Sequence, residues 1–168
     1  PGTIVKEVSN VERMLISGVA KDTDIARISV VGVPDEPGLA FKMFSKLAAK
    51  DVNIDIILQS IGRDGTKDIA FTCAKDKLND AKEVINAFMP TLKAQKVVYD
   101  EDVAKVSIVG AGMESHSGFA SKMFEALYNA NINIQMISTS EIKISVLINT
   151  ADADRAVAAL HAKFFDQH

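Results

Sequence analysis

The chain has 168 residues, of which 48% are hydrophobic and 24% are charged, a balance typical of a well-cored globular protein and not of a disordered one. Its net charge is -3 and no basic run is interleaved with aromatic residues, so we expect no nucleic-acid partner. No apolar run approaches the ~20 residues of a membrane span, and the charged N-terminal stretch is unlike a signal peptide. We therefore expect a cytoplasmic protein without membrane contact.

Cysteine and histidine are too few for a structural metal site. The single cysteine, Cys73, cannot form an internal disulfide, and the histidines at 116, 161 and 168 lack metal-ligand spacing. Cys73 lies in the apolar run IAFTC, where a thiol is more often a buried hydrophobe than a nucleophile. His116 has no acidic partner placed by the sequence, so a loop or helix-start residue is the simpler interpretation. We expect neither metal nor cofactor in this chain.

An internal repeat defines the expected architecture. Residues 26–60 align with residues 104–140, apart from a short insertion in the second copy, so that Gly38 matches Gly118. Because many matches in the same order indicate duplication, we expect two units of one fold, packed with pseudo-two-fold symmetry.

The first copy predicts the order β-α-β-β-α-β. Its first half holds a strand over 27–33, a helix whose apolar stripe runs from Leu39 to Leu47, and a strand from Asn53 in which Ile54, Ile56 and Leu58 alternate with their neighbours. A turn at 63–65 then leads into a strand over 68–73. A helix carrying Leu78, Ala81, Ile85 and Phe88 is expected to stop at Pro90, before a closing strand over 96–99.

The second copy repeats this order but ends without a closing strand. It predicts a strand over 106–109, a helix carrying Phe119 and Met123, a strand from Ile134, and two further elements with the apolar residues Ile142, Ile144, Val146, Ile148, Val157, Leu160 and Phe164. A sheet that lacks its last strand leaves an unpaired edge. The unassigned apolar segment 14–20 is expected to fill this place.

The fold class is therefore predicted as α+β: two ferredoxin-like βαββαβ units with antiparallel sheets and helices on one face. Residues 25–100 form the first unit, which is inserted into a second unit made of residues 13–22 and 101–165. A ferredoxin-like fold serves many functions and decides none of them.

The loops VPDEPGLA and AGMESHSGFA, between the first strand and first helix of each copy, are the candidate binding sites. A helix N-terminus offers free amide donors, which can hold a carboxylate. A ligand's ammonium then needs acceptors, and Asp35, Glu36, Glu141 and backbone carbonyls near 53–54 and 133–134 can supply them. Each acidic residue alone is typical of a solvated loop, but recurrence in both copies favours amino-acid binding. The glycines at 110–112 lack the rest of a dinucleotide fingerprint and are interpreted as a turn.

These residues carry a family resemblance. GVPDEPG with NIDIILQS, and KVSIVGAGMESHSGFASKMFEAL with NIQMISTSEIKISVLI, resemble the paired ACT domains in the regulatory region of aspartate kinases over essentially the whole chain. The VGAGM and ISTSEIKISVLI stretches are the more specific part. The lysine-phenylalanine-glycine-glycine motif of the kinase domain is absent, and the chain begins at Pro1, so the resemblance implies a regulatory subunit or a piece of a longer protein, with residues 1–12 as a linker from the kinase domain.

The resemblance implies two effector sites. A threonine-type site would use Asp35, Gly38, Ala40, Gln59, Asn133 and Ile134. A lysine-type site would use Met113, Gly118, Phe119, Ser140, Glu141 and Asp55. Gln135 stands where lysine-only members often carry an acidic residue.

The implied function is feedback inhibition of an aspartate kinase by threonine and/or lysine, in a homodimer formed through the ACT units. This chain would be non-catalytic by itself, and ATP and Mg would be bound by the absent catalytic domain or subunit, which phosphorylates aspartate. One alternative is a free-standing ACT sensor that regulates another protein. Another is a small ferredoxin-like enzyme, but the sequence places no acid-base pair for it.

Overall fold

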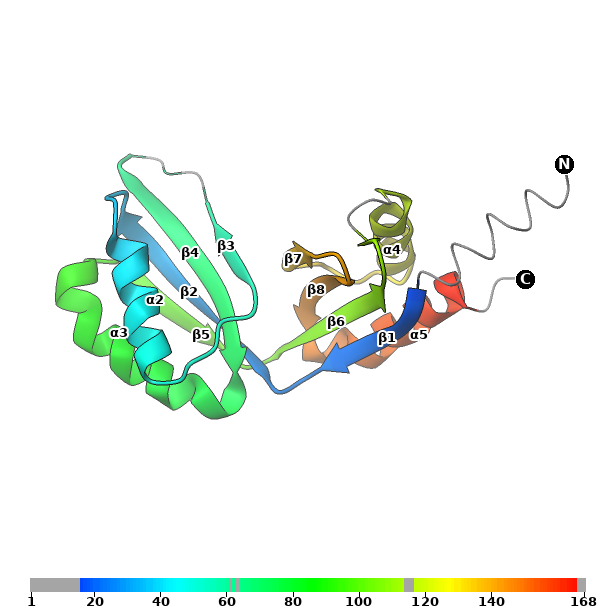
Figure 1. Ribbon diagram of the computed structural model, residues 1–168, viewed down its shortest axis with the longest axis horizontal. Helices are drawn as coiled ribbons and strands as arrows, with labels where there is room; N and C mark the ends of the chain where they lie inside the picture. Colours follow the sequence, from blue (N-terminus) through cyan, green and yellow to red (C-terminus); the bar gives the residue numbers. More distant parts are fainter. Residues whose placement is uncertain (1–15, 61, 63, 114–116, 166–168) are drawn as a thin grey trace, which may run out of the picture. The chain divides into compact units, whose positions relative to one another are not determined.

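The computed structural model describes residues 16–60, 62, 64–113 and 117–165 (Figure 1). They form two compact units: Asp24–Val103 is the first unit, and the described residues up to Thr23 together with those from Ala104 onward are the second unit. Within these residues, each unit has one four-stranded antiparallel sheet and two α-helices. The predicted fold class is confirmed.

The first unit has the predicted element order. Its elements are β2 (Ile25–Pro34), α2 (Leu39–Ala49), β3 (Ile57–Gln59), β4 (Thr66–Ala74), α3 (Leu78–Leu92) and β5 (Lys96–Asp100), and a 3-10 turn at Lys75–Lys77 leads into α3. The strand order is β3-β4-β2-β5. Both helices cover the same face of the sheet (Figure 1).

The core of the first unit lies between this sheet and these helices. Ile28, Met43, Phe71 and Ile85 are each fully buried and come from β2, α2, β4 and α3 respectively. Burial of one such side chain contributes roughly 1.5–3 kcal/mol, so the apolar stripes seen in the sequence are what hold the helices on the sheet.

A bulge in β2 allows this strand to continue to the candidate loop. The pairing with β4 shifts register between Val30 and Val33, and Gly32 has a φ of 71°. A Cβ on Gly32 would lie 2.5 Å from the Gln95 side chain, so glycine is required here. Because the bulge absorbs the irregularity, β2 runs to Pro34 and not only to residue 33.

The expected alternation before β3 holds only in part. Ile56 is buried and Ile54 packs partly against the core, but Ile57 and Leu58 are 55% and 50% exposed. The Ile56 N–H donates to the Thr72 hydroxyl at 3.0 Å, while the Thr72 N–H donates to the Ile56 carbonyl at 3.0 Å, so the pairing here is irregular. The strand is therefore shorter than predicted, and Leu58 is not a core residue.

Pro90 does not end the second helix of the first unit, which corrects the prediction. α3 continues to Leu92, which is fully buried, and Lys93 then takes a left-handed conformation with a φ of 55°. The Lys93 N–H donates to the Met89 carbonyl at 2.8 Å. Burial of Leu92 outweighs the one backbone hydrogen bond that proline removes in a last turn.

The strand that completes the sheet of the second unit precedes the first unit in sequence. Its elements are β1 (Ile16–Asp22), β6 (Val103–Gly110), α4 (Ser117–Asn129), β7 (Met136–Thr139), β8 (Lys143–Asn149), a 3-10 turn at Thr150–Asp152 and α5 (Ala153–Phe164), and the strand order is β1-β6-β8-β7. β1 pairs antiparallel with β6, from Ile16 opposite Gly110 to Asp22 opposite Lys105. The predicted crossover is confirmed from Ile16 onward, whereas residues 14 and 15 lie outside the described residues.

Ile142 does not belong to the apolar stripe of β8. It precedes the strand and is 59% exposed, while Ile144, Val146 and Ile148 are buried against the helices. The Ile142 carbonyl accepts a hydrogen bond of 2.7 Å from the Gly110 N–H, which holds this residue in the turn between β7 and β8.

Candidate functional site

In each unit, the loop before the first helix lies beside the turn between two consecutive strands. These strands are β3 and β4 in the first unit, and β7 and β8 in the second. In the first unit, the Asp35 N–H donates to the Gly65 carbonyl at 2.8 Å. In the second unit, the Met113 N–H donates to the Glu141 carbonyl at 2.9 Å. The two candidate loops of the sequence are thus built in the same way, each with a β-turn as its neighbour.

The turn between β3 and β4 contains the Asp-Gly pair that the sequence predicts for a hairpin turn. Asp64 and Gly65 both have positive φ angles, 53° and 76°, as a tight hairpin turn of the Asp-Gly type requires. Arg63 lies outside the described residues. The turn brings the Gly65 carbonyl to the loop that holds Asp35.

The start of α2 is open to an anion. Gly38 is its N-cap with a φ of 90°, and no side chain caps the helix. The first intrahelical bond near this end is from the Lys42 N–H to the Gly38 carbonyl at 3.0 Å, so the amides of the preceding turn have no partner within the helix. A Cβ on Gly38 would meet no atom within 4 Å, which leaves the approach unobstructed.

Asp35 lies in an ion pair that the sequence analysis did not identify. Its Oδ1 is 3.4 Å from Nζ of Lys67, whose side chain is only 12% exposed, whereas that of Asp35 is 52% exposed. A Cβ on Gly62 would lie 2.7 Å from Asp35 Oδ2, so the carboxylate rests against the bare backbone of that glycine. Lys67 stands opposite Val33 in the β2–β4 pairing, and this register is the signal that could have revealed it.

The other first-unit candidates surround this loop less closely. Ala40 lies in the first turn of α2 and packs partly against the core. Gln59 ends the edge strand β3 opposite Ile69 and is exposed. Asp55 is also exposed, and its N–H donates to the Thr72 carbonyl at 3.2 Å. Glu36 is exposed beside Asp35.

Two of the second-unit candidates are core residues. Met113 and Phe119 are 1% and 2% exposed, so only their backbone could face a ligand. Gly118 is exposed at the start of α4, where a Cβ would meet nothing within 4 Å. Residues 114–116, which include His116, lie outside the described residues.

The remaining second-unit candidates lie in the turn before β8. The Ser140 N–H donates to the Lys143 carbonyl at 2.8 Å, and its hydroxyl reaches the same oxygen at 3.4 Å. Glu141 has an exposed side chain, while its carbonyl accepts from Met113. Among the described residues of this loop pair, Glu141 is therefore a carboxylate that can be presented to a cation.

Asn133 and Ile134 precede β7 in the second unit; Asn133 is exposed and Ile134 packs partly against the second core. The resemblance places them beside first-unit residues, and Asp55 beside second-unit residues. Both shared sites therefore stay predictions.

Cys73, the thiol considered as a possible nucleophile, is a core residue of the first unit. Cys73 is buried, and burial, with a smaller effect from the charge of Asp76, raises the pKa of its thiol. Such a thiol is a poor nucleophile at neutral pH. The described residues hold no group of three potential metal ligands and no helix long and apolar enough to cross a membrane.

The comparisons with known proteins agree with this architecture. The ACT domain family matches residues 28–88 and 106–164, one match in each unit. An aspartate kinase of Stutzerimonas stutzeri is 46% identical over 166 residues, which is 98% of this chain and 40% of that protein. A Helicobacter pylori aspartokinase is 50% identical over 153 residues, covering 91% of this chain and 37% of its own length. The chain thus spans about 40% of the relatives it matches.

A solved structure matches nearly end to end. The ligand-free regulatory subunit of aspartate kinase from Thermus thermophilus is 38% identical, with a TM-score of 0.86, over 89% of this chain and 99% of that one. A structure of aspartokinase alpha and beta subunits is 41% identical with a TM-score of 0.82. The chain therefore belongs to the ACT domain family, as a tandem pair of the kind that forms the regulatory part of aspartate kinases.

Proposed function

We propose that this chain binds threonine and/or lysine and so mediates feedback inhibition of an aspartate kinase. The observation that carries the proposal is the loop at the start of α2, which holds the Asp35 carboxylate and leads directly into a helix end without a side-chain cap. A zwitterionic amino acid needs these two groups together, donors for its carboxylate and an acceptor for its ammonium.

Under this proposal, catalysis belongs to the part of the protein outside this chain. That part would bind ATP and Mg and phosphorylate aspartate. The alternative, a free-standing ACT sensor for another protein, differs in what the reading frame encodes beside these residues. Sequencing the parent gene therefore separates the two: a kinase domain in the same reading frame supports the regulator of an aspartate kinase, and a reading frame without one favours the free-standing sensor.

We also propose that the chain pairs with a second copy through its ACT units. The edge strands β3 and β7 expose apolar side chains, with Ile57 and Leu58 at half exposure on β3 and Ile137 at 49% on β7. An unpaired apolar edge is a ready surface for strand pairing. Effectors that span two units would then be held where copies meet.

The direct test is isothermal titration of the 168-residue chain with threonine, with lysine and with both. Methionine is the control, because it has the same ammonium and carboxylate groups but a different side chain. Saturable heat with threonine or lysine, absent with methionine, supports the proposal. If neither amino acid binds the chain, the amino-acid-sensing function is wrong for this protein.

A further inference from the structure

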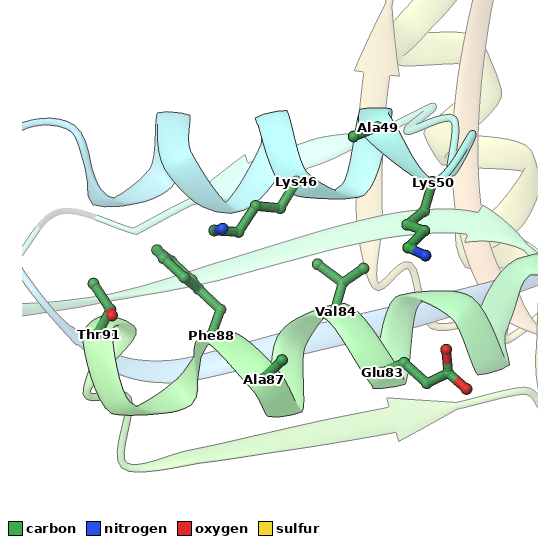
Figure 2. Close-up of a pocket in the computed structure, with 8 residues that line it drawn as sticks. All are labelled: Lys46, Ala49, Lys50, Glu83, Val84, Ala87, Phe88 and Thr91. Carbon is green, nitrogen blue, oxygen red and sulfur yellow. The ribbon is translucent and has the colours of Figure 1, made fainter.

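A groove of about 470 Å³ lies between α2 and α3 on the helical layer of the first unit (Figure 2). α2 contributes Lys46, Ala49 and Lys50 to its lining, and Val84 and Phe88 of α3 are the main apolar residues opposite. The volume falls in the range of sites for small organic ligands. The loop residues around Asp35 are not part of it.

The groove combines an apolar wall with two ammonium groups. Val84 and Phe88 point from α3 towards α2; Lys46 extends along the groove towards its Phe88 end, and Lys50 points towards α3 at the Glu83 end (Figure 2). Nζ of Lys46 lies 5.5 Å from the centroid of the Phe88 ring. A ligand with an apolar body and a negative group would meet both kinds of surface at once.

The two lysines lack a counter-charge. Within the described part of the chain, no carboxylate lies within 4.0 Å of Nζ of Lys46 or Lys50, although Glu83 lines the same groove. Lys42, Lys46 and Lys50 are spaced four residues apart, so they form one row of like charges on the helix, which is unfavourable without an anion. The dipole of α2 favours cations at this end but does not cancel their charge over the groove.

The second unit supplies an internal comparison. A matching hollow of about 370 Å³ lies between α4 and α5. There Ala126 and Ala130 stand where the repeat places Lys46 and Lys50, and the only lining cation among the described residues, Lys163, bonds Glu125 at 2.6 Å. The duplicated fold thus makes the hollow twice, but among the described residues the lysines of the first hollow have no carboxylate partner, whereas the lysine of the second does.

We propose that the α2–α3 groove of the first unit is a second ligand site, separate from the loop site, that takes a small organic anion. Its carboxylate or phosphate lies between Lys46 and Lys50, and its apolar body packs against Val84 and Phe88. The chemistry requires one anionic group and one apolar group in the same molecule, and it does not depend on amino-acid binding at Asp35.

The test is an amide-resolved NMR titration of the 168-residue chain with phenyl phosphate, with inorganic phosphate as the second arm. We expect saturable shifts in residues 46–50 and 83–91 and none in 126–130 and 159–163. Phenyl phosphate should bind at least about fivefold more tightly than inorganic phosphate, since only the former covers the apolar wall.

The variant Lys46→Ala/Lys50→Ala introduces the alanines that the second unit carries at the matching positions 126 and 130, and it should weaken phenyl phosphate binding by about tenfold or more. Alanine is the best helix former, so α2 should remain intact. Lys42→Ala is the matched control, because it removes a cation of the same row that does not line the groove, and it should bind as wild type. Equal shifts in both grooves, equal affinity of the double variant, or no saturation up to about 10 mM ligand would overturn the proposal.

Discussion

The loops at the starts of α2 and α4 share a backbone but differ in charge. Asp35 and Met113 make the same bond to the neighbouring turn, yet the first is a half-exposed carboxylate and the second a buried thioether. Lys67 and Ile142 also occupy matching positions. Lys67 precedes Asp68, whose carbonyl accepts from the Ser60 N–H, and Ile142 precedes Lys143, whose carbonyl accepts from the Ser140 N–H. Duplication therefore kept the scaffold, while side-chain charge separated the two sites.

This difference bears on which ligand each site can hold. The first loop offers a carboxylate with a neighbouring cation, so an arriving ammonium competes with Lys67 for Asp35. The second loop offers Glu141 on its turn, and no cation among the described residues forms an ion pair with it. We expect different effectors at the two loops, and the predictions below test that difference.

Replacing Asp35 by alanine should have the largest effect. If its carboxylate holds the ligand's ammonium in a pair that binding buries, removal should weaken threonine binding by roughly 2 kcal/mol or more, because a buried ammonium is left without its partner. Titration calorimetry measures this. Glu36→Ala is the control, since it removes the adjacent exposed carboxylate and should change affinity little. Threonine affinity that is unchanged in Asp35→Ala would place the ammonium elsewhere.

Ligand should also strengthen association between copies of the chain. A ligand that binds only the paired state stabilises that state by about 2.7 kcal/mol at a hundred times its dissociation constant. Sedimentation velocity near the dimer dissociation constant, with and without threonine, should show a shift towards dimer. An unaltered distribution at saturating threonine would mean that the site lies within one chain.

Gly62→Ala should disturb the first loop without removing any charge. The added Cβ would lie 2.7 Å from Asp35 Oδ2 and 3.0 Å from the Thr66 carbonyl, so the carboxylate must move. We expect threonine affinity to fall by about 1–2 kcal/mol, the cost of modest overpacking. Gly118→Ala is the matched control in the other unit, because its Cβ would meet nothing within 4 Å. An intact affinity in Gly62→Ala would show that the position of Asp35 is adjustable.

Much of the fold follows from local pattern. The helices α2 and α3 carry apolar residues at helical spacing, and the crossover of β1 follows because a repeat lacked one strand while one apolar segment lacked a place. Pro90 shows where prediction from local pattern fails. The proline predicts a helix end, but α3 continues because Leu92 is buried, and this burial is visible only in the packed core.

The candidate site was harder to predict than the fold. The position of Asp35 in a loop before a helix was visible, but its partner Lys67 is 32 residues away and meets it only through the β2–β4 register. A bulge at Gly32 sets that register, and a bulge shifts every later pair by one place. Burial of Met113 was missed for a related reason, since a glycine-rich loop sequence does not show which residues turn inward.

Lys67→Met should have the smallest effect and the most informative sign. It replaces the cation of the first-unit ion pair by an apolar side chain, as at the matching position Ile142 of the second unit. Since Asp35 is 52% exposed, the pair is partly screened and contributes at most about 1 kcal/mol. If Lys67 competes with the ligand's ammonium, the variant should bind threonine more tightly, by no more than about fivefold, and the gain should shrink as salt screens the wild-type pair. Calorimetry at low and high salt measures both. Weaker binding by the variant would contradict competition, and would instead mean that the Lys67 ammonium helps to hold the ligand's carboxylate beside the amides of α2.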